Sequence, residues 1–292
     1  MNYLIHLLIM IGIYLIQVYG LNLVVGYSGL LSLCQAVFYG IGAYACTLLM
    51  LNLHLPFGGA LALGSAFTGI FALALAPASL RFRGDTFVIV TLGVQMIVFT
   101  ILYNWMGLTR GPYGIPGIPR PELFGHAITS LPGYLLLTSC ILLLVFACIS
   151  MIHKSPFGLA LKALRDNEMA ATGLGKSPVA MFRHAFVIAA FCGGLSGGLF
   201  ATYVTYIDPT SFTLDESIFL VTILLVGGSG NRIGPLLGTL FMLLLPELLR
   251  FLGLPDTIAP NVRQIIYGVV LILLMFLRPQ GIAGEAMAKQ GS

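Results

Sequence analysis

The chain is a succession of apolar runs, each about as long as a lipid bilayer is thick. Nine such runs lie at residues 3–25, 33–51, 57–79, 86–105, 131–152, 183–206, 216–230, 235–252 and 261–277. A helix of about 20 apolar residues crosses the hydrocarbon core and satisfies its own backbone hydrogen bonds there. Only 8% of the 292 residues are charged, against about 25% in soluble domains. The sequence therefore predicts an all-α fold: one transmembrane domain over residues 1–292, built as a polytopic helix bundle of about 8–10 spans.

Lysine and arginine residues predict how this bundle is oriented. If nine spans begin outside the cell, ten of the 14 basic residues face the cytoplasm, and only Arg110, Arg120, Arg250 and Arg263 face outward. Basic residues are enriched in cytoplasmic loops, so we expect a multi-pass protein of the inner, cytoplasmic membrane with its N-terminus outside. The net charge of +4 comes from basic residues that mostly flank the spans, beside membrane lipid. This charge gives no indication of a nucleic-acid partner.

One polar segment interrupts the apolar pattern: KSPFGLALKALRDNEMAATGLGKSP, residues 154–178, here called the charged insert. Each of its Lys-Ser-Pro triplets supplies a serine that can cap a helix and a proline suited to the first helical position. Residues 157–174 between them are mostly strong helix formers, and Gly173 and Gly175 can take the left-handed conformation that ends helices. The pattern predicts one short, separately capped helix in a cytoplasmic loop of about residues 153–180.

The predicted helix of the charged insert has two different faces. One carries small and apolar residues, at Ala160, Ala163, Leu164, Ala170, Ala171 and Leu174; the other carries Lys162, Arg165, Asp166 and Glu168. A helix lying on the inner leaflet accounts for the basic residues, whereas anionic headgroups would repel the two carboxylates. Mixed charge beside small residues favours docking in the groove of a partner protein, and the lipid-surface interpretation remains the alternative.

Three polar residues within the spans are candidates for a solute path. Gln35, Gln95 and Asn104 either line such a path or bridge helices by hydrogen bonds, because polar groups at membrane depth need a cavity or a partner. We expect no carboxylate in the middle of a span, and we place Glu216 at an outer boundary. Proton- or sodium-coupled carriers usually bury one, so this pattern counts against an autonomous carrier or channel, which is the first alternative class of function.

Glycine residues define three further segments of interest. It interrupts the spans at residues 22–33 and 224–238, and paired breaks of this kind belong either to a path between discontinuous helices or to simple tight turns. Within residues 191–200, the pairs Gly193/Gly197 and Gly194/Gly198 have four-residue spacing. That spacing predicts close helix packing and not a binding site.

The charged insert resembles the coupling helix of ABC importer permeases, which carries a Glu-Ala-Ala…Gly signature. The matching residues are Glu168, Ala170, Ala171 and Gly175, with Met169 interposed and the glycine one position later than in the general pattern. That departure is similar to the branch handling branched-chain amino acids. Four further stretches, at 26–44, 80–97, 104–119 and 224–250, resemble the LivH/LivM permease family of branched-chain amino acid importers, and its LivM-type subunit in particular. Cys34 departs from the glycine expected at its position.

This resemblance implies a transport subunit without an ATPase site of its own. Two ABC ATPases would dock on the coupling residues Arg165, Asp166, Glu168, Ala170, Ala171 and Gly175. ATP and Mg²⁺ would bind only to those partners, because this chain has no G-x-x-x-x-G-K-[ST] motif, and we expect no cofactor on the chain itself. A second, LivH-like permease would enclose the path as a heterodimer, and a periplasmic binding protein would deliver branched-chain or other hydrophobic amino acids.

Two questions stay open at the level of sequence. Relatives that carry amides, urea or other small solutes leave the exact solute undecided. A membrane-embedded enzyme is the second alternative class of function, but no constellation of histidine, cysteine or carboxylate residues has catalytic or metal-binding spacing. We therefore predict no catalytic residue and no metal site.

Overall fold

A computed structural model describes residues 2–79, 81–82, 84–123, 126–250, 268–269, 272 and 281–283. Within this part of the chain nearly all regular structure is helical, and seven helices are long and apolar enough to cross a membrane. One further apolar helix is shorter. The predicted all-α, polytopic bundle is therefore confirmed.

The elements follow one another in a simple order. The helices are α1 (Asn2–Asn22), continued by the π-helix η1 (Leu23–Tyr27), then α2 (Gln35–Asn52), α3 (Phe57–Ser79), α4 (Asp85–Asn104), α5 (Met106–Thr109), the 3-10 helix η2 (Gly111–Tyr113), α6 (Leu131–Lys154), α7 (Pro156–Asp166), α8 (Glu168–Gly173), α9 (Pro178–Val204), the 3-10 helix η3 (Pro209–Phe212), α10 (Leu214–Gly227) and α11 (Gly234–Arg250). Two short antiparallel strand pairs are β1 (Ile115–Pro116) with β4 (Tyr206–Ile207), and β2 (Glu122–Leu123) with β3 (His126–Ala127).

Eight of the nine predicted spans correspond to described helices. The α9 helix begins at Pro178, ahead of the apolar run that starts at residue 183, because the second Lys-Ser-Pro triplet opens the membrane helix directly. The ninth predicted span, 261–277, lies outside the described residues except for 268–269 and 272.

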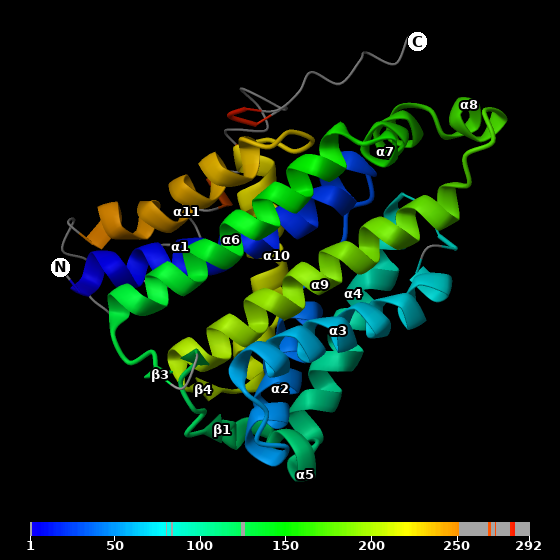
Figure 1. Cartoon of the computed structure of the whole chain (residues 1–292). Helices are drawn as coiled ribbons and strands as arrows, with labels where there is room; N and C mark the ends of the chain where they lie inside the picture. The colour runs from blue at the N-terminus through cyan, green and yellow to red at the C-terminus, as the bar shows by residue number, and fades with distance from the viewer. Residues whose placement is uncertain are drawn as a thin grey trace.

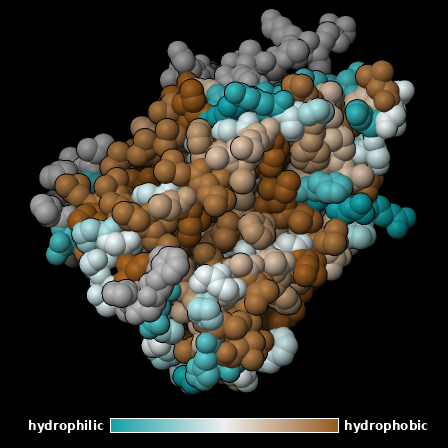
Figure 2. All heavy atoms as spheres, viewed as in Figure 1, coloured by the Kyte–Doolittle hydropathy of each residue, from teal (hydrophilic) through white to brown (hydrophobic). Residues whose placement is uncertain are grey.

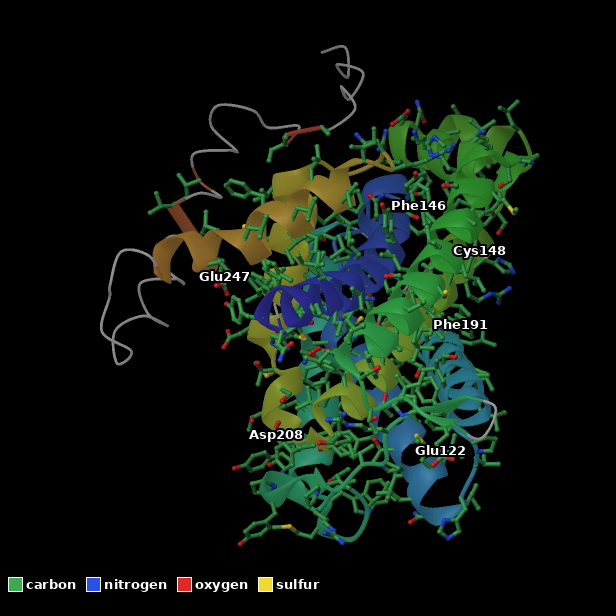
Figure 3. All side chains as sticks on the ribbon, turned by 60° about the vertical axis from the view of Figure 1, so that its left-hand side comes forward. Glu122, Phe146, Cys148, Phe191, Asp208 and Glu247 are labelled. Carbon is green, nitrogen blue, oxygen red and sulfur yellow. The ribbon has the colours of Figure 1, made fainter. Side chains whose placement is uncertain are left out.

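The bundle has two ends with different contents. The α7 and α8 helices lie together at one end, called here the insert end, and the strand pairs lie with α5 at the other, called the strand end (Figure 1). Figure 3 shows Glu122 and Asp208 at the strand end, away from the green α7–α8 segment. Between the ends, hydrophobic residues form a broad band across the face seen in Figure 2, and hydrophilic residues gather toward its edges. This distribution is typical of a bundle that crosses a bilayer.

The α9 helix lies at the centre of the bundle, and its glycines allow the close packing. Gly197 lies against the backbone of Tyr39 and Ala43 in α2, where a Cβ atom would be 2.7 Å from the Ala43 nitrogen. Gly194 faces α3, where a Cβ atom would be 2.8 Å from the Ser65 Cα. Because a methyl group fits at neither position, the predicted close packing is confirmed, and it occurs on two faces of α9.

Two helices begin inside the bundle and not at its ends. The backbone N–H of Ala36, in the first turn of α2, donates to Ser217 Oγ in the first turn of α10 at 2.9 Å. Before α10, the chain leaves β4 at the strand end and turns inward through η3. There the centre of the Phe212 ring lies 5.1 Å from the centre of the Tyr39 ring. The 14 residues of α10 extend about 21 Å, less than the roughly 30 Å hydrocarbon core.

Candidate functional site at the insert end

The charged insert folds as two helices, so the prediction of a single helix over residues 157–174 is wrong. The α7 helix ends at Asp166 and α8 begins at Glu168, because Asn167 between them is extended, with φ −155° and ψ 99°. The Asn167 side chain accepts a hydrogen bond from the backbone N–H of Ala170 at 3.0 Å. Asparagine is among the best N-cap residues. Helix propensity summed over the segment conceals this second helix start.

The predicted ends of the charged insert are confirmed in most respects. Ser155 caps α7 by accepting a hydrogen bond from the backbone N–H of Gly158 at 3.3 Å, and a proline is the first helical residue. After α8, Gly175 is in the left-handed conformation, with φ 78°. The α9 helix begins at Pro178 as expected, although Ser177 makes no side-chain capping hydrogen bond. Local capping chemistry therefore determines where these helices begin and end.

The break at Asn167 also changes which residues face the bundle. The small and apolar residues that were expected to share one contact face are divided: Ala160, Leu164 and Ala171 are buried, whereas Ala163, Ala170 and Leu174 are exposed. In α8 and just after it, Met169 is 84% exposed and Leu174 is 82% exposed. The prediction of a single contact stripe is therefore wrong for half of its members.

The α7 helix is held on the bundle by its inward face. Leu161 and Leu164 are almost fully buried. The Lys162 Nζ atom lies 5.3 Å from the centre of the Tyr27 ring, and the Tyr27 hydroxyl is hydrogen-bonded to His153 Nδ1 at 2.6 Å. Tyr27 ends η1 and His153 lies in the last turn of α6. The α7 helix therefore rests on the ends of two long spans.

Arg165 differs from the other predicted coupling residues because its side chain turns toward the bundle. Its side chain is only 13% exposed. The Nη1 atom donates to the Gly26 carbonyl oxygen at 2.6 Å, and Nε donates to Asp166 Oδ1 at 3.1 Å. The remaining predicted coupling residues are exposed or half-buried at Asp166, Glu168, Ala170 and Gly175, and buried at Ala171. Contact of these residues with an ATPase stays a prediction, and Arg165 itself points into its own chain.

The two glycine breaks, which lie far apart in the sequence, meet at the insert end. The Asn22 side chain is fully buried; its Nδ2 donates to the Asn231 carbonyl oxygen at 2.7 Å, and its Oδ1 accepts from the Gly230 N–H at 3.0 Å. Gly26 lies so near to Asn22 and Gly230 that a Cβ atom on it would collide with both. The breaks therefore form one structure, called here the glycine junction, made of residues 22–29 and 228–231.

A distant segment completes the end of α10 beside the glycine junction. The backbone N–H groups of Ile282 and Ala283 donate to the carbonyl oxygens of Val226 and Gly227, each at 2.9 Å. The last carbonyls of a helix lack partners within the helix, so these bonds satisfy the carboxyl end of α10. Segments from both halves of the chain and from its C-terminal region thus converge at the insert end.

The three candidate path residues are not all brought together. Gln35 Nε2 donates to the Ala189 carbonyl oxygen at 3.2 Å, and Gln95 Nε2 donates to the Phe212 carbonyl oxygen at 2.9 Å. Ser217, which accepts from the α2 backbone, also donates to Gln95 Oε1 at 3.3 Å. Asn104 is exposed at the end of α4 and donates to the Thr100 carbonyl oxygen of its own helix at 2.8 Å.

These contacts favour the helix-bridging interpretation for Gln35 and Gln95. Sequence reasoning did not single out Ser217 or Asn22, although each lies within a segment of interest. A serine in the first turn of α10 and an asparagine directly before a glycine break are the signals that were available. Lining of a solute path by Gln35, Gln95 or Asn104 remains a prediction.

The expectation that no carboxylate lies in the middle of a span is wrong. The apolar helical segment Pro209–Gly227 includes Glu216, whose carboxyl group is hydrogen-bonded by the Tyr14 hydroxyl. Tyr14 is in the second half of α1, away from both of its ends. Sequence reasoning placed Glu216 at an outer boundary, because hydropathy did not show that β4 and η3 carry the chain inward before α10 begins.

Among the residues that the structure describes, no group of three or more histidine, cysteine, aspartate or glutamate side chains is arranged to hold a metal ion. The insert end presents exposed apolar and charged side chains on and around α8, and α7 packs on the ends of α1 and α6.

Comparison with known proteins adds a separate observation. A family model described as the permease component of branched-chain amino acid transport systems matches residues 3–275. The high-affinity branched-chain amino acid transport system permease proteins LivM of Salmonella typhimurium and Escherichia coli are each 34% identical over 294 residues, which covers 92% of this chain and 67% of each relative. The guanosine ABC transporter permease protein NupQ of Bacillus subtilis is 28% identical over 219 residues, which covers 69% of this chain and 67% of that relative. No solved structure matches the chain significantly.

Proposed function

The chain belongs to the family of permease components of branched-chain amino acid transport systems, and we propose that it is one permease subunit of an ATP-driven importer for branched-chain and other hydrophobic amino acids. It is a multi-pass membrane protein. The observation that carries the proposal is the family match over residues 3–275. This match includes both glycine breaks and the whole charged insert, so it covers the candidate functional site and not only the apolar spans.

The proposed assembly contains four kinds of partner. A second, LivH-like permease encloses the path together with this chain, and two ABC ATPases bind at the insert end. A periplasmic binding protein delivers the solute at the strand end, and lipid of the inner membrane surrounds the spans. ATP and Mg²⁺ bind to the ATPases, and this chain contributes no ATPase site and no cofactor of its own.

The surface of α8 supports the docking part of this proposal. Met169 and Leu174 are large apolar side chains held away from the bundle, with more than four fifths of each exposed. Asp166 and Glu168 lie beside them in sequence, so the surface combines apolar contact with negative charge. Exposed apolar side chains stabilise a complex when they enter a groove on a partner, and acidic residues at an interface contribute orientation more than affinity.

The packing of α7 supports the transmission part. Because α7 rests on the ends of α1 and α6, a displacement of α7 and α8 by the ATPases reaches long spans directly. Alternating access then follows if the spans on the two sides of the path move as rigid elements, as is usual in transporters. Leu161 and Leu164 in the buried face of α7 make this contact apolar and closely packed.

The test is purification and reconstitution of the complex. This chain is expected to bring down a similar permease and two ATPases. In proteoliposomes containing ATP, with the binding protein added outside, it is expected to accumulate leucine, isoleucine and valine. Glu168→Lys and Gly175→Leu are expected to reduce transport-coupled ATP hydrolysis. Unaltered coupled hydrolysis in both insert variants would show that the insert does not dock the ATPases.

One comparison favours an alternative solute. A relative that covers 69% of this chain is a guanosine permease, so members of this group of proteins differ in cargo. Competition of leucine uptake by nucleosides, amides and urea separates these possibilities: a solute that is transported with ATP but not displaced by leucine would replace the amino-acid assignment. Gradient-driven flux through the purified chain without any ATPase would instead identify an autonomous carrier.

A further inference from the structure

The Arg165 side chain occupies a slot formed by three glycines. Its Cγ atom lies 2.8 Å from the position that a Cβ atom would take on Gly29, and its Nη1 atom lies 2.9 Å from the corresponding position on Gly230. The same Nη1 donates to the carbonyl oxygen of Gly26. Gly26 and Gly29 belong to the first glycine break and Gly230 to the second. Arg165 therefore lies where the two parts of the glycine junction face each other.

The hydrogen bond from Arg165 gives a partner to the Gly26 carbonyl oxygen at the end of the first span. Three carbonyls near that end have described partners: Leu23 accepts from Ser28 Oγ at 2.9 Å, Val24 accepts from the Leu30 N–H at 3.1 Å, and Gly26 accepts from Arg165. Of these three, only Gly26 depends on a different part of the chain. A cation is favourable at the carboxyl end of a helix because the helix dipole is negative there, and a charge-assisted hydrogen bond is stronger than a neutral one.

A π-helix lies at the same place. The η1 segment forms the last turn of the first span, and single π-helical turns are rare and occur frequently at functional sites. The residue directly before η1 is Asn22, whose amide bonds to Gly230 and Asn231 in the second break, and Gly26 packs closely against both Asn22 and Gly230. Displacement of Gly26 is therefore expected to displace residues 228–231 and, through them, the end of α10.

Arginine suits this position better than lysine. The planar guanidinium directs Nη1 at the Gly26 carbonyl and Nε at the Asp166 carboxylate at the same time. A lysine ammonium is a single charged centre on a flexible stem and does not reproduce this fork. The side chain is largely buried, so loss of its bond leaves the Gly26 carbonyl with no partner among the described residues.

From this geometry we propose that Arg165 is a positioning residue that couples the charged insert to the glycine junction, so that movement of α7 displaces the ends of α1 and α10 together. The inference rests on the proposed function, because coupling needs ATPases that move α7. It differs from the docking role predicted for Arg165 from the sequence, because Arg165 contacts the chain's own backbone while α8 carries the exposed surface.

The first test replaces Arg165 in the full transporter. Arg165→Met is expected to leave the amount of co-purified ATPase and its basal hydrolysis unchanged, and to lower the solute moved per ATP hydrolysed by about tenfold, a typical size for a coupling between two sites. Arg165→Lys is expected to restore part of this ratio. Lys176→Met removes a positive charge from the same insert without altering the slot, and is expected to keep the wild-type ratio.

The second test blocks the slot by a substitution outside α7. Gly230→Ala places a methyl group against Nη1 at a residue with φ 89°, and is expected to lower the ratio as Arg165→Met does. Gly117→Ala is the matched control, because Gly117 has a similar φ of 75° but no heavy atom within 4 Å of the added Cβ. Gly117→Ala carries the strain of a left-handed alanine without the collision, so a loss shared by both variants would overturn the slot argument.

A measurement that does not depend on transport separates the inference from the proposed function. Amide hydrogen exchange of residues 226–232 in the complex is expected to become about tenfold faster in Arg165→Met, because the junction opens locally more often. Equal exchange in wild type and variant overturns the inference even if transport falls. Loss of ATPase co-purification in Arg165→Met would show that Arg165 is a docking residue. Absence of ATP-driven uptake by the wild-type complex rejects the proposed function and leaves the exchange result to decide whether Arg165 holds the junction.

Discussion

Replacing Gly197 by alanine tests whether backbone contact between α9 and α2 determines the packing of the bundle. The added Cβ would collide with the Tyr39 carbonyl oxygen and lie 2.7 Å from the Ala43 nitrogen. Non-bonded heavy atoms involving carbon prefer about 3.5–4.0 Å, so the two helices must separate by roughly 1 Å at this crossing. The colliding atoms belong to backbone and cannot rotate away, as a side chain would.

The magnitude follows from two opposing terms. Overpacking of a well-packed core costs about 1–3 kcal/mol, and contact with backbone favours the upper end of that range. Alanine has a helix propensity about 1 kcal/mol better than that of glycine, which offsets part of the cost. The net destabilisation is therefore about 2 kcal/mol, or roughly 4–8 °C in the melting temperature of a chain of this size.

The assay is thermal unfolding of the purified chain in detergent, followed by the fraction that remains monodisperse after heating. Gly93→Ala is the matched control, because Gly93 also lies within a long helix but has no heavy atom within 4 Å of an added Cβ. That control is expected to melt at or slightly above the wild-type temperature. If Gly197→Ala melts no lower than Gly93→Ala, the close approach of α9 and α2 does not limit packing, and the reasoning fails.

Three further predictions concern polar side chains. Gln17→Met is expected to raise the melting temperature, because Gln17 is fully buried and neither side-chain polar atom has a partner among the described residues; an unsatisfied group costs about 1–3 kcal/mol. Tyr134→Phe is expected to lower stability by about 0.5–1.5 kcal/mol in the same unfolding assay, since the hydroxyl donates to the Leu199 carbonyl oxygen at 2.5 Å. Asn104→Ala is expected to leave uptake unchanged, whereas Gln95→Leu is expected to destabilise the chain by breaking a buried bridge between helices. An equal loss of uptake in both variants would instead support a shared path.

Features that depend on neighbouring residues were predictable from the sequence. The spans follow from uninterrupted apolar runs, and the ends of the charged insert follow from the serine, proline and glycine residues that cap helices. The close packing of α9 follows from glycines at four-residue spacing, because such residues lie on one helix face. The same local logic could also have found the break at Asn167, since an asparagine followed by an acidic residue is a recognised helix start.

Features that depend on distant residues were not predictable in this way. Arg165 was assigned to an outward face, because a helix pattern gives angular positions but not which face meets the bundle. The meeting of Asn22 with residues 230 and 231 joins segments that are separated by most of the chain. Glu216 was placed at a boundary, because its depth depends on how β4 and η3 direct the chain before α10 begins.

The short helix α10 connects the insert end to the hydrogen bonds that Ser217 makes with Ala36 and Gln95 inside the bundle. One end of α10 lies at the glycine junction, and the first turn at its other end carries Ser217, which bonds to α2 and to Gln95. A helix of 14 residues is a rigid rod of about 21 Å, so a tilt of about 10° about one end moves the other by roughly 3–4 Å. That displacement exceeds the range of a hydrogen bond. A tilt of that size, started at the glycine junction through Arg165, would therefore break the hydrogen bonds by which Ser217 joins α10 to α2 and α4.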